Sequence, residues 1–313
     1  DAKLARAFAT RERLFDQPFY RLVHAEAEGL PGVIVDRFGD AAVIQPNAAW
    51  ADARVEDFAD ALMAITGVSV VVKNGSGRSR VLEGLDDASG VIRGALDAPI
   101  PVLMNGATYM ADLLGGQKTG LFYDQRPNHA FVASLARDTD VLDVFSHVGG
   151  FALAALAGGA KSALAVDGSK AALTLAWAGA KASGMVDRFD TKVGDAFEVM
   201  SALADEGRTF ETVICDPPAF APHKQARDAG MRAYEKVARL ASLLVAPNGT
   251  LTLCSCSHAV DLDQFRAASL RGIGRVRRDC QILRTGYAGP DHPQHPQLAE
   301  SGYLKALTFR FLG

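Results

Sequence analysis

Short apolar runs alternate with longer amphipathic segments from about residue 139 onward. The apolar runs have the length and composition of buried strands and lie at 140–146, 162–168, 189–195, 212–218 and 250–257. Helical periodicity fills the segments at 149–159, 169–184, 196–207, 229–249 and 261–272, several of which end in Gly. Strands that alternate with helices are typical of a parallel sheet covered on both faces, so the sequence predicts a doubly wound α/β fold.

Two further apolar segments, 275–283 and 303–312, follow the last predicted helix. We expect them to form an antiparallel pair at the edge of the sheet. Upstream, Asn105 and Gly106 stand between two extended runs. This dipeptide predicts a two-residue hairpin turn, because both residues readily adopt positive φ.

The segment before the hairpin mixes strand and helix signals. Strand-like runs lie at 32–38 and 42–47, and a helix is expected at 50–65. We therefore predict a smaller α+β domain, which would face RNA, ahead of the larger one. The predicted domains are residues 1–98 for the α+β domain, 99–112 for a hairpin linker and 113–313 for the α/β domain.

Composition narrows the class of protein. The chain has 313 residues, of which 49% are hydrophobic, enough for a large core. It contains no apolar run long enough for a transmembrane helix and no apolar centre of a secretion signal near its start, so we expect a cytoplasmic protein without a membrane partner. Four cysteines without a C-x-x-C pair fit neither a disulfide scaffold nor a zinc site. We expect reduced thiols and no metal, with Cys215 and Cys280 buried.

The net charge of −3 gives no overall attraction to nucleic acid. Two basic clusters are local candidates for an RNA contact: Lys73, Arg78 and Arg80, and Arg275, Arg277 and Arg278. For each cluster taken alone, solvated surface charge is the simpler interpretation.

The loop after the first strand of the α/β domain carries Gly149 and Gly150, which let the backbone turn sharply near a ligand. The dinucleotide motif G-x-G-x-x-G is absent, so a nucleoside-type ligand is favoured over a pyrophosphate. Asp167 and Asp195 end the next two strands, at the edge where such ligands bind. Asp167 is placed to accept hydrogen bonds from two ribose hydroxyls, and Asp195 from the amino group of an adenine. The alternative for each acid is an N-cap of the following helix.

These features resemble a class I S-adenosylmethionine-dependent methyltransferase with a Rossmann-like sheet. More specifically, GGQKTGLFYDQRPNH (115–129), DVFSHVGGF, DPPAF and SCS resemble the bacterial 23S ribosomal RNA large-subunit cytosine-C5 methyltransferases of the cytosine-1962 type. The resemblance covers nearly the whole chain and implies ribosomal RNA as a partner, with a homodimer left open. Members carry an RNA-binding PUA domain ahead of this point. The chain does not begin with Met, so we expect such a segment to be missing from it.

The resemblance also implies S-adenosyl-L-methionine as the cofactor. It would contact Lys118, Thr119, Phe122, Tyr123, Asp124, Gln125, Arg126, Asp143, Phe145, Ser146, Gly149, Gly150, Asp167, Gly168, Ser169, Asp195, Ala196 and Asp216. Gln125 and Arg126 suit the methionine carboxylate, because a guanidinium matches a carboxylate with two parallel hydrogen bonds. A helix-entry turn ending at Pro127 is the structural alternative for this stretch. The family loop commonly reads Ser-Tyr-Thr-Gly-Gly, whereas His147 and Val148 stand here, so a hydroxyl is lost beside the ligand.

Asp216 ends another strand and is followed by Pro217 and Pro218, which remove two backbone donors and stiffen the loop. In methyltransferases a loop of this kind holds the target base, and Phe220 offers the base a stacking face. A rigid strand exit is the alternative interpretation. Asp216 is also the candidate for protonating or hydrogen-bonding ring nitrogen 3 of a cytosine.

Cys254 and Cys256 stand two residues apart on a strand and share one face. Carbon 5 of cytosine is too weak a nucleophile to attack a sulfonium methyl unaided, so a thiolate must first add to carbon 6. Only the cysteine nearer the carboxyl end reaches the rim, which selects Cys256, and the resemblance through SCS selects the same residue. The base that removes the carbon 5 proton is left open, with His258 as one candidate.

The leading hypothesis is therefore cytosine carbon 5 methylation of large-subunit ribosomal RNA. One alternative is a methyltransferase that acts on another target, such as a guanine nitrogen or a protein side chain, for which Cys256 would be dispensable. A second alternative is a nucleotide- or RNA-binding module without transfer activity. Thiol, acid and aromatic groups at separate strand ends argue against the module, because a pure binder needs no nucleophile.

Overall fold

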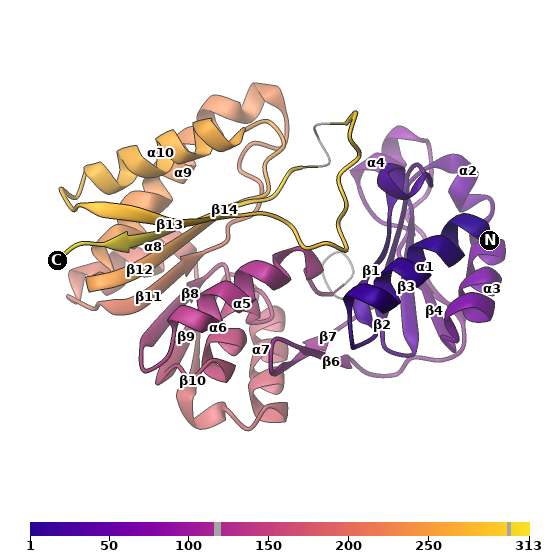
Figure 1. The fold of residues 1–313 in the computed structure, drawn as a ribbon, viewed down its shortest axis with the longest axis horizontal. Coiled ribbons are helices and arrows are strands. Elements are labelled where there is room, and N and C mark those ends of the chain that lie inside the picture. The colour runs from indigo at the N-terminus through magenta and orange to yellow at the C-terminus, as the bar shows by residue number, and fades with distance from the viewer. Residues whose placement is uncertain (116–119, 299–301) are drawn as a thin grey trace. The chain divides into compact units, whose positions relative to one another are not determined.

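The computed structural model describes residues 1–115, 120–298 and 302–313 (Figure 1). The chain divides into two compact units. The first unit comprises Asp1–Leu103, Met110–Asp124 and Gly289–Ser301, and the second comprises Met104–Tyr109, Gln125–Ala288 and Gly302–Gly313. The domain limits expected at 98 and 112 stay a prediction, since compactness alone does not show which segments fold independently.

The second unit is built on a mixed sheet in the order β10-β9-β8-β11-β12-β14-β13. Its strands are β8 (Asp140–Val144), β9 (Ser162–Asp167), β10 (Phe189–Val193), β11 (Phe210–Cys215), β12 (Val245–Ser255), β13 (Cys280–Gly286) and β14 (Lys305–Phe311). The first five strands in this order pair in parallel, whereas β14 and β13 add antiparallel at one edge. The predicted doubly wound fold with an antiparallel edge is confirmed.

Helices cover both faces of this sheet (Figure 1). One face carries α5 (Arg126–Leu135), α6 (Gly150–Ala157) and α7 (Lys170–Ala182), and the other carries α8 (Ala196–Asp205), α9 (Arg227–Leu243) and α10 (Leu262–Gly274). The residues of α6 are apolar on every face of the helix, as expected for a helix that is buried on all sides. No helix in the described part of the chain has the length and apolarity that a bilayer crossing requires.

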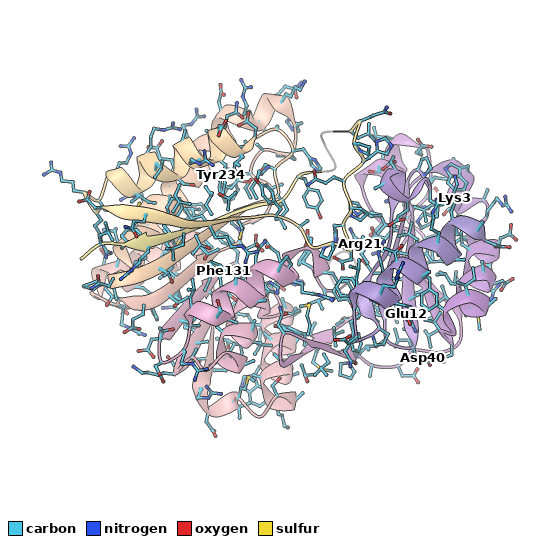
Figure 2. All side chains as sticks on the ribbon, in the orientation of Figure 1. Lys3, Glu12, Arg21, Asp40, Phe131 and Tyr234 are labelled. Atoms are coloured by element: carbon cyan, nitrogen blue, oxygen red, sulfur yellow. The ribbon has the colours of Figure 1, made fainter. Side chains whose placement is uncertain are left out.

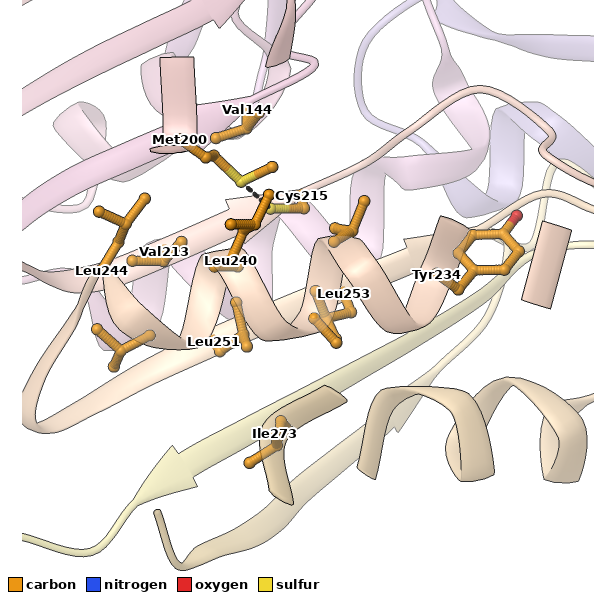
Figure 3. Close-up of a cluster of buried hydrophobic side chains, with 14 of the residues drawn as sticks. Val144, Met200, Val213, Cys215, Tyr234, Leu240, Leu244, Leu251, Leu253 and Ile273 are labelled. Carbon is orange, nitrogen blue, oxygen red and sulfur yellow. Dashed lines mark hydrogen bonds between the residues drawn. The ribbon is translucent and has the colours of Figure 1, made fainter. Parts of the chain in front are cut away.

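A core of buried side chains lies between the sheet and the helices α8, α9 and α10 (Figure 3). Leu251 on β12 and Leu240 on α9 are both at most 4% exposed. Cys215 packs into this core as an apolar residue, with its sulfur 4.0 Å from that of Met200. The expected burial of Cys215 is confirmed. The same expectation for Cys280 is wrong, because that residue begins the edge strand β13 and is only half-buried.

The first unit contains a sheet in the order β1-β2-β3-β4-β5. Its elements are α1 (Ala2–Leu14), β1 (Phe19–His24), β2 (Val33–Phe38), β3 (Ala41–Pro46), α2 (Ala49–Asp52), α3 (Val55–Thr66), β4 (Val70–Lys73), α4 (Arg78–Leu82) and β5 (Gly90–Arg93). Only β3 and β4 pair in parallel, and α2 and α3 supply the crossover that such a pair needs. The single helix expected at 50–65 is wrong, because the chain turns between α2 and α3.

The hairpin predicted around Asn105 is confirmed. Strands β6 (Ile100–Met104) and β7 (Ala107–Ala111) form a two-stranded sheet. Between them Asn105 has φ 52° and Gly106 has φ 77°, the two positive angles that a tight hairpin turn requires.

Ion pairs and hydrogen bonds tie part of each basic cluster into the fold. Lys73 lies 2.7 Å from Asp52, and Arg80, which is 2% exposed, lies 2.8 Å from the same carboxylate. Their interpretation as solvated surface charge is therefore wrong. In the second cluster, Arg278 donates hydrogen bonds to the carbonyl of Ser242 on α9 and to that of Ala246 on β12. Arg275 and Arg277 are exposed, as expected for surface charge.

The packing of α10 on α9 gives a stability prediction. A Cβ built on Gly272 would lie 2.4 Å from the carbonyl oxygen of Glu235, whereas one on Gly274 would meet no atom within 4 Å. Gly272→Ala should lower the free energy of unfolding by about 1–3 kcal/mol, because the two helices must separate. Gly274→Ala, its matched control, should leave stability unchanged or raise it by up to about 1 kcal/mol. Urea denaturation of both variants measures the difference, and an equal effect would contradict the close packing.

Candidate active site

The strand order of the second unit reverses between β8 and β11. After β8 the next strands, β9 and β10, are added on one side of it. The following strands, β11 and β12, are added on the other side of β8. The loops that leave the carboxyl ends of β8 and β11 therefore turn toward opposite faces. In open α/β sheets, ligands bind at this switch point.

The loop between β8 and α6 holds an unusual backbone. Phe145 and His147 lie in the left-handed region, at φ 63° and 50°, and Gly149 follows at φ 80°. Left-handed conformations of non-glycine residues cost free energy of order 1 kcal/mol and persist only where other interactions fix them. Here the amide of Ser146 donates to β9 over 3.0 Å, and the amide of His147 donates to Asp167 Oδ2 over 2.8 Å.

Asp143 lies fully buried beneath the first turn of α6. Its Oδ2 accepts a hydrogen bond from the amide of Ala152 at 2.9 Å. Burial raises the pKa of Asp143 to about 8; the Ala152 amide opposes this shift, and the charges of Asp216 and Asp167 add to it. Asp143 is thus a protonated acid over most of the neutral range.

Asp167 and Asp195 play different parts. The carboxylate of Asp167 accepts hydrogen bonds from the backbone amides of His147 at 2.8 Å and Ser169 at 2.7 Å. Neither amide belongs to the first turn of a helix. The hydroxyl of Ser169, and not Asp167, caps α7. Asp195 caps α8, because its Oδ1 accepts from two amides of the first turn at 2.9 and 3.1 Å. The capping alternative therefore holds for Asp195 and not for Asp167.

The start of α5 brings two polar residues to this edge. The Gln125 amide faces the thiol of Cys254 and partly offsets the burial that raises the pKa of that thiol well above its usual value. Arg126 lies within electrostatic reach of Tyr109, whose hydroxyl donates to the carbonyl of Gly150 at 3.2 Å. Gln125 thus lies beside β12, and Arg126 lies near the loop before α6.

Two buried polar atoms mark where a ligand would fit. Asp143 Oδ1 and Ser146 Oγ have no hydrogen-bond partner among the residues that the structure describes. An unsatisfied buried group costs about 1–3 kcal/mol, so both atoms call for partners from a bound molecule. At Gly168 the space is open, since a Cβ there would meet nothing closer than the Gly194 carbonyl at 3.9 Å. These acids, with the guanidinium of Arg126, suit a nucleoside that carries a carboxylate.

Other expected cofactor residues lie elsewhere in the chain. Lys118 and Thr119 fall outside the described residues. Phe122, Tyr123 and Asp124 belong to the first unit. Tyr123 is buried there, and its hydroxyl donates to the carbonyl of Arg37 at 2.8 Å, so the ring has a structural partner within that unit.

The loop after β11 is held by aromatic packing. Asp216 follows the strand, Pro217 is buried and Pro218 is exposed. The half-buried ring of Phe220 has three aromatic neighbours: Tyr234 at 5.0 Å, Phe197 at 6.2 Å and Phe145 at 6.3 Å between centroids. Tyr234 lies on α9, Phe197 on α8 and Phe145 in the loop after β8, so the cluster joins three further elements to the loop of Phe220.

The two cysteines at the end of β12 differ in depth, as their spacing predicts. Cys254 is 1% exposed, whereas Cys256 lies just beyond the strand and is half-buried. The parallel register pairs Cys215 with Leu253, which sets Asp216 beside Cys254. None of the four cysteines forms a disulfide.

A chain of buried hydroxyls connects this loop to its neighbour. Ser255 donates to the Tyr234 hydroxyl at 2.9 Å, that hydroxyl lies 2.7 Å from Ser257 Oγ, and Ser257 Oγ accepts from the amide of Ala221 at 3.0 Å. Tyr234 lies on α9 (Figure 2). The loop that carries Cys256 is thereby fixed to the loop that follows β11.

Sequence reasoning missed these hydroxyls and also Lys305, which is buried on β14. The available signal was a single polar residue inside an apolar segment, as in Tyr303-Leu304-Lys305-Ala306. His258 is exposed, with its ring 5.4 Å from that of Tyr303. Among the described residues, no group of His, Cys, Asp or Glu has the arrangement of a metal site.

The fold and the switch-point residues together define a doubly wound α/β protein with a site for a nucleoside. A family model described as S-adenosylmethionine-dependent methyltransferase matches residues 61–310. The chain belongs to this family, and S-adenosylmethionine is its cofactor.

Individual proteins agree with this assignment. The chain is 33% identical over 317 residues to "Ribosomal RNA large subunit methyltransferase I" of Shewanella denitrificans, covering 98% of this chain and 79% of that protein. A solved methyltransferase complexed with SAH superposes with a TM-score of 0.85 at 22% identity, over 99% of this chain and 80% of that one. The tRNA m1G37 methyltransferase of M. jannaschii superposes with a TM-score of 0.63 at 16% identity, over 95% of this chain and 76% of that one.

The raised pKa of Asp143 predicts how stability depends on pH. Between about pH 4 and 8 the unfolded chain releases this proton and the folded chain retains it, so stability falls as pH rises through this range. Asp143→Asn should remove that part of the slope. Leu142→Ala, on the same strand, should instead lower the free energy of unfolding by about 2–5 kcal/mol at every pH. Urea titrations at pH 5 and 8 measure the free energy of unfolding of each protein. If Asp143→Asn keeps the wild-type dependence of this free energy on pH, the assignment of a raised pKa to Asp143 is contradicted.

Proposed function

We propose that this protein transfers a methyl group from S-adenosylmethionine to carbon 5 of a cytosine in large-subunit ribosomal RNA. The observation that carries the proposal is the half-buried thiol of Cys256 at the rim of the methyltransferase sheet. Methylation of a nitrogen or an oxygen needs no such nucleophile. The 33% identity to a ribosomal RNA large subunit methyltransferase supports ribosomal RNA as the substrate.

In the proposed complex the cofactor lies along the loop between β8 and α6. Asp167 retains acceptor lone pairs beyond its two amide bonds, and these would receive the ribose hydroxyls. Asp195 would accept from the adenine amino group, and Arg126 would bind the methionine carboxylate. Asp143 Oδ1 and Ser146 Oγ would gain the partners that they lack among the described residues. When bound, the cofactor supplies an electrophilic methyl group on a positively charged sulfur.

The target cytosine would enter beside the loop after β11. Pro217 and Pro218 stiffen this loop, and the partly exposed ring of Phe220 offers a stacking surface. The aromatic neighbours of Phe220 keep its ring in place, so the base would dock on a preformed surface. Flipping a base out of its stack for such contacts is general among enzymes that modify bases.

The chemistry then follows from Cys256. Its thiolate adds to carbon 6 of the base, which forms a C–S bond and moves the electron pair of the 5,6 double bond toward carbon 5. Asp216 in its protonated form donates a hydrogen bond to ring nitrogen 3, where negative charge builds up. Once carbon 5 carries the methyl group, a base removes the carbon 5 proton. The electron pair of that C–H bond re-forms the double bond, and the thiolate leaves.

The role of Asp167 is tested by ligand binding. An Asn side chain has one acceptor oxygen, so Asp167→Asn leaves one of the two amides facing an NH₂ group. We expect the Kd for S-adenosylhomocysteine to rise about tenfold or more, equivalent to about 1.4 kcal/mol. Asp261→Asn is the matched control, because Asp261 caps α10 outside the proposed cofactor site and Asn caps helices as well as Asp does, so its affinity should stay within about threefold. Calorimetric titration measures both, and equal affinities would remove Asp167 from the site.

The nucleophile is tested by nucleoside mass spectrometry on unmodified large-subunit RNA incubated with S-adenosylmethionine. Wild type should form 5-methylcytosine, and Cys256→Ala should lower the rate by about a thousandfold or more. Cys254→Ala removes the deeper thiol and should retain most of the activity. S-adenosylhomocysteine should bind all three proteins alike, which separates lost chemistry from lost folding.

Each other outcome has a defined meaning. If Cys256→Ala methylates as fast as wild type, the covalent mechanism is wrong, and the modified nucleoside in the spectrum identifies the true target atom. If wild type binds S-adenosylhomocysteine but modifies no nucleoside of this RNA, the proposed substrate is wrong.

A further inference from the structure

Lys305 is a charged residue in an apolar place. It begins β14 between Leu304 and Ala306, is 5% exposed and pairs in the sheet with Ser255 of β12. Lysine is rarely this buried, because desolvating an ammonium group costs free energy unless partners replace the water. A position on the innermost antiparallel strand therefore requires local compensation.

The compensation comes from the loop that carries Cys256. Lys305 Nζ donates to the carbonyl of Ser257 at 2.8 Å and to the carbonyl of Val260 at 2.7 Å. Ser257 follows Cys256 directly, so the ammonium group fixes the backbone immediately after the thiol. An ammonium group has three N–H donors, and two of them are used in this way.

The charged and titratable groups around Cys256 come from several elements. Lys305 on β14 and Tyr234 on α9 both lie within electrostatic reach of the Cys256 thiol. Asp216 after β11 acts on the neighbouring Cys254, and His258 stands two residues further along the same loop. Asp261 also lies within electrostatic reach of Lys305. Of these groups, Lys305 is the buried cation.

We propose, resting on the function proposed above, that Lys305 is a positioning residue for the nucleophile: its buried ammonium group fixes the loop of Cys256 and stabilises the thiolate. The electrostatics agree in sign. A thiolate beside a cation is favoured, which is how reactive cysteines obtain their ionised form near neutral pH. Burial lowers the pKa of Lys305 to about 8, and the charges of Cys256 and Asp261 oppose that shift, so the ammonium form still predominates at pH 7.

The test measures the thiol directly, without RNA or cofactor. Purified full-length chain is treated with iodoacetamide between pH 5.5 and 10, and the alkylation rate of each cysteine is read by peptide mass spectrometry. Cys256 is half-buried and within reach of the reagent, and half-buried Cys280 on β13 serves as an internal reference. In wild type, we expect Cys256 to ionise below the ordinary cysteine pKa of about 8.5.

Three variants separate charge from packing. Lys305→Met removes the ammonium group and should slow Cys256 alkylation at pH 7 about tenfold, by moving the midpoint of the profile up by about one unit. Lys305→Arg keeps the charge and should stay within about threefold. Thr308→Val breaks the hydrogen bond to Thr252 further along β14 and should leave the Cys256 profile unchanged. The Cys280 rate should be the same in all four proteins.

The proposal is overturned if Lys305→Met keeps the wild-type Cys256 profile while Cys280 reacts normally, because Lys305 would then be structural only. It is also overturned if Cys256 of the wild type ionises at or above 8.5, a result that needs no variant. Failure of the RNA methylation assay together with a shifted thiol profile would refute the proposed substrate and leave the assignment of Lys305 intact.

Discussion

The carboxyl group of Asp143 beneath α6 is the contact on which the site depends. It holds the first turn of α6 through the Ala152 amide, and in doing so it fixes the direction in which the loop after β8 leaves the sheet. That loop contains Phe145 and His147 in left-handed conformations, which stay in place because the amides of the loop bond to β9 and Asp167. The buried Asp143 carboxyl group and its hydrogen bond thus help to fix the loop between β8 and α6. This loop presents its polar atoms to a ligand.

Much of this architecture could be predicted from the sequence, because its causes are local. Strands such as β8 and β11 are short and continuously apolar, and the helices between them show a clear period, so the doubly wound sheet follows directly. The Asn105-Gly106 turn was predictable for the same reason, since two adjacent residues determine it. The family resemblance added the identity of the cofactor.

What could not be predicted depends on contacts between distant segments. Lys305 binds the carbonyl of Ser257, which lies 48 residues away in the sequence. A pattern within a short stretch of sequence cannot reveal a contact between such distant residues. The assignment of residues 122–124 and 289–298 to the first unit also depends on contacts between distant segments. An Asp at the end of a strand can cap the following helix, and only the hydrogen bonds show that Asp195 does so and Asp167 does not. The ion pairs of Lys73 and Arg80 likewise depend on Asp52, which lies on α2 in a different part of the sequence.

The three acids at the switch point have a consequence for turnover. Asp167 and Asp216 act electrostatically on Asp143 and favour its protonated form, so the negative charge at this edge of the sheet comes from Asp167 and Asp216. Methyl transfer converts a sulfonium cation into a neutral thioether. A site with negative potential holds the cation more tightly than the thioether. In the proposed complex these acids would therefore favour exchange of the neutral product for a fresh sulfonium cofactor.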